Sequence, residues 1–161
     1  MVVEISKYQD FLDCSVDLFY PQLVGVDLSL AKVSRIDSGY ASVGAILKTG
    51  TSIGSFYKEI SSQGNLFHLS PGVYSFVFEQ GINLDSSHYA EIVPRSSLVR
   101  CGGLIGSGIY EPGYKVKSIA AVVHLSNYIS IERGARVVQL KIYKGHEFGI
   151  YDGQWKDNDI K

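Results

Sequence analysis

One short segment of the chain combines several groups that bind phosphate. Residues Pro94-Arg95-Ser96-Ser97 place an arginine, two hydroxyls and a predicted helix N-terminus within four positions. A guanidinium fork and free backbone N–H groups are suited to phosphate oxygens. An arginine beside a capped helix is also a common surface arrangement, so this segment alone indicates a phosphate site without establishing one.

The elements around this segment are predicted to be mostly strands. Residues 24–33 carry apolar side chains at every second position, the period of a half-buried strand. Further runs of strand length are 66–69, 73–78, 90–93, 119–125 and 137–143, with turns at 71–72, 112–113 and 132–134. Residues 95–100 predict a short helix after Pro94. Short strands with regular turns and no long amphipathic helix predict an all-β barrel or jelly roll.

The length of 161 residues fits one domain with its own hydrophobic core. We expect a single β-domain over 1–147, with a Gly- and Ser-rich insertion at 34–65 that contains a short strand near 45–47. Residues 148–161 are expected to form a tail. The formal net charge of −1 argues against a partner that is a nucleic-acid polymer, which would call for a basic excess.

The two cysteines do not indicate a metal site. Cys14 and Cys101 have no Cys/His ligand spacing, which favours a reduced, intracellular chain but leaves a single disulfide open. No apolar run approaches the ~20 residues of a membrane span, and the start has no signal-peptide pattern. We therefore expect a soluble, cytoplasmic protein without a membrane partner.

Five ordered strings then resemble a known superfamily. PRSSLVRCG is followed by GSGIYEPGY and RGARVVQL, and it is preceded by GVDL at 25–28 and LSPGVYSFVFEQ at 69–80. These strings resemble the motifs of trimeric dUTPases and dCTP deaminases over roughly 24–143, and archaeal dUTPases in particular. The resemblance implies the distorted jelly-roll barrel of that superfamily, also described as a β-clip.

The resemblance also implies roles for individual residues. Glu111 falls where dUTPases place the aspartate that activates the attacking water, and a carboxylate suits a general base. Tyr114 matches the aromatic that packs against deoxyribose and excludes a 2′-hydroxyl. A Gly-rich turn lets the backbone approach a base closely, so the hairpin around 102–110 would read the pyrimidine. The remaining substrate contacts implied are Arg95, Ser96, Ser97, Arg100, Gly108, Tyr110 and Gln139.

A metal and an assembly are implied in the same way. Asp27 would hold Mg²⁺ through water, an ion that prefers few protein ligands beside phosphates and water. The family further implies a homotrimer whose sites combine residues of neighbouring subunits. Asp27 could instead bond to a neighbouring turn, Gln139 could be a satisfied strand amide, and Tyr114 could be an ordinary barrel aromatic.

Three functions remain open on the sequence. The first is hydrolysis of dUTP to dUMP and pyrophosphate. The second is deamination of dCTP, alone or combined with hydrolysis. Arg100 matches an arginine of the deaminases and favours this function. His124, three residues before Asn127, stands where the deaminases carry a glutamate and argues against it. The third is a regulatory protein that binds nucleotides without turnover, a reading favoured by glutamate rather than aspartate at 111.

The C-terminal segment resembles the tail of archaeal members and deaminases more than the Gly- and Arg-rich last motif of many dUTPases. In that group the tail closes over the nucleotide. Tyr151 and Gln154 are therefore candidate lid residues, and Lys156 is a candidate phosphate contact. The polar ending could equally be a frayed terminus.

Overall fold

A computed structural model describes residues 1–37, 57–106, 108–145 and 150–152. The five longest strands are β3 (Val26–Ile36), β6 (Gly72–Phe78), β8 (His88–Pro94), β12 (Ala120–Leu125) and β14 (Arg136–Lys144). Shorter strands are β1 (Leu12–Asp13), β2 (Tyr20–Pro21), β4 (Tyr57–Glu59), β5 (Leu66–Leu69), β7 (Gly81–Asn83), β9 (Gly103–Gly106), β10 (Ile109–Tyr110), β11 (Lys115–Val116) and β13 (Ile129–Glu132). Helical segments are short: η1 (Ile5–Asp10), η2 (Val16–Leu18) and α1 (Ser96–Arg100).

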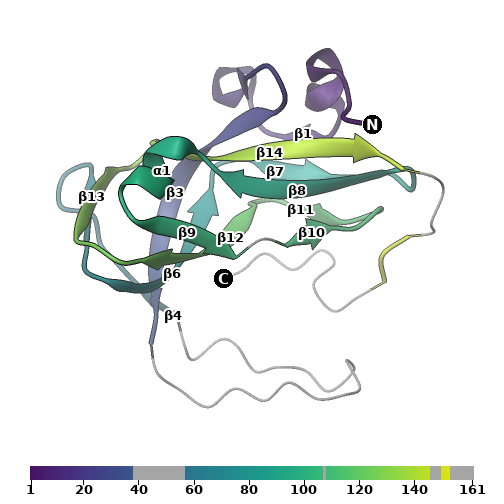
Figure 1. The fold of residues 1–161 in the computed structure, drawn as a ribbon. Coiled ribbons are helices and arrows are strands. Elements are labelled where there is room, and N and C mark those ends of the chain that lie inside the picture. The colour runs from purple at the N-terminus through teal and green to yellow at the C-terminus, as the bar shows by residue number, and fades with distance from the viewer. Residues whose placement is uncertain (38–56, 107, 146–149, 153–161) are drawn as a thin grey trace.

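The strands form antiparallel sheets that curl around one core (Figure 1). The largest has the order β10-β8-β14-β3-β6-β12-β9, and β2 and β4 also pair with β3. Two smaller sheets, β1-β7-β11 and β13-β5, complete the described fold. The arrangement confirms the predicted all-β class with few short helices.

Period-two burial explains why these residues form strands. In β12 the buried side chains alternate with outward ones, and Ala121, Val123 and Leu125 face the core. The first five residues of β3 are buried on both faces. Ser29, on the outward face of β3, is covered by the buried side chain of Gln80. The Gln80 side chain accepts a hydrogen bond of 3.0 Å from the Ser29 backbone N–H and donates one of 2.8 Å to the Leu18 carbonyl.

The N-terminal segment (purple in Figure 1) packs along β14. Tyr8 is fully buried, and its hydroxyl accepts a hydrogen bond of 2.8 Å from the backbone N–H of Ile142. Burial raises the pKa of the Tyr8 phenol, because the charged form would lose its hydration. No helix in the described part of the chain is long and apolar enough to cross a membrane.

The segment expected as a loop-rich insertion has strand at both of its ends. Residues 34–36 continue β3, and β4 pairs with them in the register Ser34↔Glu59 to Ile36↔Tyr57. The sequence did not predict these strand ends because their residues are mostly polar and partly exposed, so no apolar residue recurs at every second position. Residues 38–56, including the short strand expected near 45–47, lie outside the described residues.

Candidate active site

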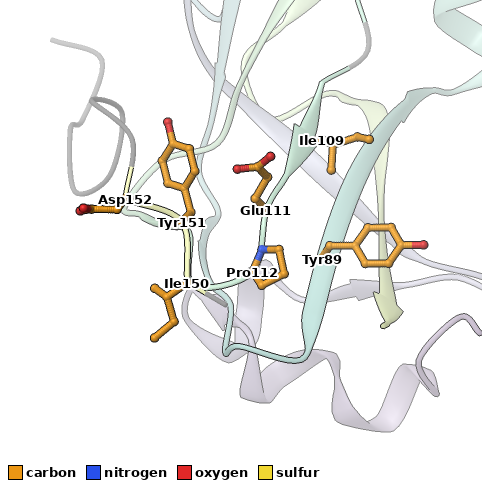
Figure 2. Close-up of a pocket in the computed structure, with 7 residues that line it drawn as sticks. All are labelled: Tyr89, Ile109, Glu111, Pro112, Ile150, Tyr151 and Asp152. Carbon is orange, nitrogen blue, oxygen red and sulfur yellow. The ribbon is translucent and has the colours of Figure 1, made fainter. Parts of the chain in front are cut away.

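A cavity of about 450 Å³ lies beside Glu111. Its lining residues come from β8, from β10 and the turn after it, and from the C-terminal segment; they are Tyr89, Ile109, Glu111, Pro112, Ile150, Tyr151 and Asp152. Figure 2 shows the Glu111 carboxylate pointing to the same side as the Tyr151 phenol. The carboxylate is exposed and can therefore hold a water molecule. We call this space the Glu111 cavity.

A row of three tyrosines backs the Glu111 cavity. The ring centroids of Tyr110 and Tyr114 are 5.4 Å apart, and those of Tyr114 and Tyr151 are 5.5 Å apart. Burial, and secondarily the nearby Tyr151, raise the pKa of the Tyr114 phenol. The neutral, half-buried Tyr114 ring can pack against an apolar sugar face.

The side chain of Tyr110 is committed to the fold. Its hydroxyl donates a hydrogen bond of 3.0 Å to the carbonyl of Ala120, and burial raises the pKa of the phenol. The hairpin expected around 102–110 is not formed by pairing of its two strands, because β9 pairs with β12 and β10 pairs with β8. Base reading by this backbone stays a prediction. Gly108 is exposed and has open space around it, whereas Ser107 lies outside the described residues.

The described part of the tail is docked on the turn that carries Glu111. The backbone N–H of Tyr151 donates a hydrogen bond of 2.7 Å to the carbonyl of Pro112. Ile150 packs over Gly113, which has a φ of +77° and no room for a Cβ. Tyr151 thus lines the cavity, and its role as a lid residue stays a prediction. Gln154 and Lys156 fall outside the described residues.

A second group of predicted residues gathers at the far end of β8. Arg95 is the N-cap of α1, and its backbone N–H donates to Val137 in β14 at 2.9 Å. The Arg95 Nη1 lies 3.0 Å from the Asp27 Oδ2 and donates to the Arg136 carbonyl at 3.1 Å. Arg136 Nη1 is 4.0 Å from the same carboxylate oxygen. We call Asp27, Arg95 and Arg136 the arginine cluster.

The carboxylate of the arginine cluster is fully buried. Burial raises the pKa of Asp27, and this effect is opposed by Arg95, by Arg136 and by the neighbouring Gln139 side chain. Gln139 sits directly opposite Asp27 in the β3–β14 ladder. The close fit of the two strands depends on Gly25, where a Cβ would lie 2.5 Å from the Leu140 carbonyl oxygen.

The arginine cluster does not fit the magnesium role expected for Asp27. A hydrated Mg²⁺ needs ligand space around the carboxylate, whereas Asp27 has no exposed surface and two guanidinium groups lie within 4.0 Å of it. A further cation there would meet charge repulsion. Among the described residues no group of three or more His, Cys, Asp or Glu side chains could hold a metal.

Arg136 was missed by the sequence reasoning, although it lies within the quoted RGARVVQL string. Simple alternation from Gln139 places Arg136 on the opposite face of β14. The β3–β14 register shifts between Arg136 and Val138, and this bulge turns Arg136 to the side of Asp27. A bulge has no reliable sequence signal, so only the string itself, three residues before Gln139, could have pointed to Arg136.

The other predicted residues are spread around these groups. Ser96 and Ser97 are the exposed first residues of α1, and Arg100 is its exposed last residue. His124 is exposed on β12, where it pairs with Leu104 of β9. It therefore lies on the outer face of the sheet and does not line the Glu111 cavity.

Within one chain the two groups are far apart. Tyr89, which lines the Glu111 cavity, and Arg95 are six residues apart along β8, or about 20 Å at ~3.3 Å per residue. Figure 1 shows α1 at one end of β8 and β10 near the other. This separation argues against contact of Glu111 and Arg95 of one chain with a single triphosphate.

The comparison with a family model decides the classification. The model described as dCTP deaminase-like matches residues 7–145, which is most of the chain and includes Glu111 and the arginine cluster. The chain belongs to the dCTP deaminase-like family. The match begins before β1 and ends just after β14, so it includes the whole described barrel.

Individual relatives refine this assignment. A protein of Methanopyrus kandleri named a probable deoxyuridine 5′-triphosphate nucleotidohydrolase is 30% identical over 148 residues, 90% of this chain and 92% of its own length. A relative of the same name from Methanococcoides burtonii is 33% identical over 97 residues, 58% of this chain and 56% of that protein. Both relatives carry the name of a dUTP-hydrolysing enzyme.

A solved structure shows the same fold. The 2′-deoxycytidine 5′-triphosphate deaminase from Agrobacterium tumefaciens superposes with a TM-score of 0.70 at 18% identity, over 90% of this chain. This chain spans 47% of the deaminase chain, or about half its length. At that identity the likeness shows a shared fold alone.

Proposed function

We propose that this protein hydrolyses dUTP to dUMP and pyrophosphate. The observation that carries the proposal is the exposed Glu111 carboxylate. It lies in a cavity lined by residues of the GIYEPGY string and by Tyr151, whose ring packs beside that of Tyr114. The names of the archaeal relatives support the same reaction.

In the proposed reaction, Glu111 holds a water molecule and accepts its proton. The water oxygen forms a bond to the α-phosphorus, the bond from that phosphorus to the bridging oxygen breaks, and pyrophosphate leaves. Tyr114 packs against the deoxyribose, and the backbone around Gly108 and Tyr110 reads the uracil. The rest is positioning and charge stabilisation, which are the main means of catalysis in phosphoryl transfer.

The phosphates are assigned to the other end of β8. Arg95 and Ser96 bind phosphate oxygens. Further substrate contacts come from Ser97 and Arg100, which also lie on α1, and from Gln139, which lies opposite Asp27. Guanidinium–phosphate hydrogen bonds are charge-assisted and strong. Magnesium stays an expectation for the reaction as a whole, and none of the steps described for these residues depends on it.

Hydrolysis is favoured over deamination because of His124. This residue occupies the place of the deaminase glutamate, and an imidazole is not the group expected to direct water attack on cytosine. Incubation with Mg²⁺ and either dUTP or dCTP, followed by separation of nucleotide, pyrophosphate and ammonia, tests the choice. We expect pyrophosphate from dUTP only; ammonia from dCTP would replace the proposal with deamination, and binding without product would favour a regulatory protein.

The role of Glu111 is tested by Glu111→Gln, which keeps the shape and removes the base. We expect kcat to fall by about 10²-fold or more, the usual contribution of a positioned base. The affinity for dUTP should change little. Full activity of Glu111→Gln would remove this residue from the mechanism.

We further propose that the active form is a homotrimer, in which the Glu111 cavity of one subunit meets the arginine cluster of another. The separation of about 20 Å along β8 supports a shared site. The exposed apolar side chains Leu104, Ile109 and Val122, which are 62%, 69% and 38% exposed, support a contact between subunits. A cytoplasmic location stays a prediction.

Sharing of the site can be tested by mixing two inactive proteins. Glu111→Gln and Arg95→Gln damage different halves of the proposed site. If the halves come from different subunits, unfolding and refolding the two variants together should restore part of the activity. Refolding each variant alone is the control, and no recovery in the mixture would argue for sites within single chains.

A further inference from the structure

The buried carboxylate of Asp27 is surrounded by positive charge. It lies on β3 between β2 and β14, opposite Tyr20 on one side and Gln139 on the other. Its surface is completely covered, and its Oδ2 is 3.0 Å from Arg95 Nη1 and 4.0 Å from Arg136 Nη1. Ionising such a buried carboxyl is costly unless paired charges compensate.

The two guanidinium groups are held on several sides. Arg95 contacts the carboxylate and also donates to the Arg136 carbonyl at 3.1 Å. The Arg136 guanidinium carbon lies 5.1 Å from the centroid of the Tyr20 ring, within the range of a cation–π contact. Two like charges this close repel each other, and the shared carboxylate offsets that repulsion.

The side chains of both arginines are nevertheless partly exposed to solvent. The Arg95 side chain is 35% exposed and that of Arg136 is 43% exposed, whereas Asp27 is not exposed at all. One negative and two positive groups leave the cluster with a surplus of one positive charge. The carboxylate is inside and the free guanidinium N–H groups are outside, next to Ser96 and Ser97 at the start of α1.

We propose, on the basis of the phosphate role proposed above for Arg95, that Asp27 is a positioning residue for an arginine pair and that Arg136 binds phosphate beside Arg95. Asp27 acts through the two guanidinium groups from behind and does not touch the substrate or a metal. This assignment replaces the magnesium role expected for Asp27, which the burial and charge of its surroundings do not fit.

Phosphate binding without metal gives a direct test. The probe is inorganic triphosphate in the presence of EDTA, titrated calorimetrically against the purified protein and its variants. We expect Arg136→Gln to weaken binding by about tenfold or more, the scale of one charge-assisted hydrogen bond. Lys144→Gln removes a positive charge from an exposed position of the same strand, outside the arginine cluster, and should change binding little.

Asp27→Asn separates the positioning role from simple charge effects and from metal binding. Removal of a negative charge near an anion site should by itself strengthen binding, whereas loss of positioning should weaken it. We expect about tenfold weaker triphosphate binding in EDTA and an unchanged Mg²⁺ midpoint for dUTP hydrolysis. In an Arg136→Gln background the Asp27→Asn effect should shrink, because part of that effect acts through Arg136.

Each outcome bears on the proposal. Unchanged or tighter triphosphate binding by Asp27→Asn, or a raised Mg²⁺ midpoint, would overturn the positioning role in favour of a metal ligand. If Asp27→Asn does not fold, Arg136→Gln decides, and binding equal to that of Lys144→Gln would overturn the arginine pair. The binding test needs no turnover, so it can succeed even where dUTP hydrolysis fails, and the reverse.

Discussion

The contact between the tail and the Glu111 turn can be broken by one methyl group. A Cβ placed on Gly113 would lie 2.4 Å from Ile150 Cγ2, 3.2 Å from its Cβ and 3.4 Å from its Cα. Rotation of the Ile150 side chain would move only the first of these atoms, so the tail itself must shift. Gly113→Ala should therefore undock the tail.

The magnitude follows from what undocking removes. The hydrogen bond from Tyr151 to Pro112 contributes about 1 kcal/mol, and the Tyr114–Tyr151 ring pair about another 1 kcal/mol. A loss of about 2 kcal/mol shifts the docking equilibrium by about 30-fold. If the docked tail helps to hold substrate, KM for dUTP rises by up to the same factor.

Gly134→Ala is the matched control. Gly134 has a φ of +82°, close to the +77° of Gly113, but nothing lies within 4 Å of its added Cβ. Both variants therefore carry the cost of about 1–2 kcal/mol for an alanine in the left-handed region, and only Gly113→Ala meets the tail. A difference between them reports the tail contact and not backbone strain.

Amide hydrogen exchange at Tyr151 measures docking directly, and steady-state kinetics measure its effect on substrate. We expect faster Tyr151 exchange and a higher KM in Gly113→Ala, with Gly134→Ala close to the unsubstituted protein. Equal Tyr151 exchange in the two variants would refute the docked tail. Faster exchange without any change in KM would refute its role in substrate binding.

Two further predictions concern the assembly and the alkaline limit of stability. Val122→Asp places a charge on the exposed apolar face and should shift the protein toward monomers in analytical ultracentrifugation, whereas Lys144→Gln should not. The Tyr143 hydroxyl donates to Glu91, and burial and this carboxylate raise the pKa of Tyr143 from 10.0 to about 12. Because the folded-state pKa is raised, the contribution is present below pH 10 and is lost as the pH rises to about 12. In urea unfolding, Tyr143→Phe should therefore lose less free energy of unfolding between pH 10 and pH 12 than the unsubstituted protein. An equal loss in both proteins would contradict the Tyr143–Glu91 pair.

The sequence predicted the parts of the fold that have a strong local period. The core strands β3, β6, β12 and β14 were located to within about three residues, because their apolar residues alternate. The two-residue strands, such as β10, carry no period and were not found. Their position depends on pairing with distant strands, as in Ile109↔Glu91, and pairing partners are not encoded in local pattern.

The candidate site was predicted in a similarly uneven way. Motif strings identified Glu111, Tyr114 and Arg95 by residue type and order. In the structure, Glu111 and Tyr114 lie near Tyr151, and Arg95 lies near Asp27. Arg136 was overlooked because a bulge reverses its face. The expected function of Asp27 depended on its surroundings, and burial by neighbouring strands is a tertiary property that its own residue type does not reveal.

The geometry of β8 connects these observations. A strand separates its ends by ~3.3 Å per residue whatever its sequence, so the seven residues of β8 hold the Glu111 cavity and the arginine cluster apart permanently. Motif order along the chain gives the impression of a single site, because Arg95 and Glu111 are only 16 positions apart. The strand between them supports the proposal that a second copy supplies the missing half of the site. The exposed apolar side chains near β9, β10 and β12 offer the surface through which that copy can bind.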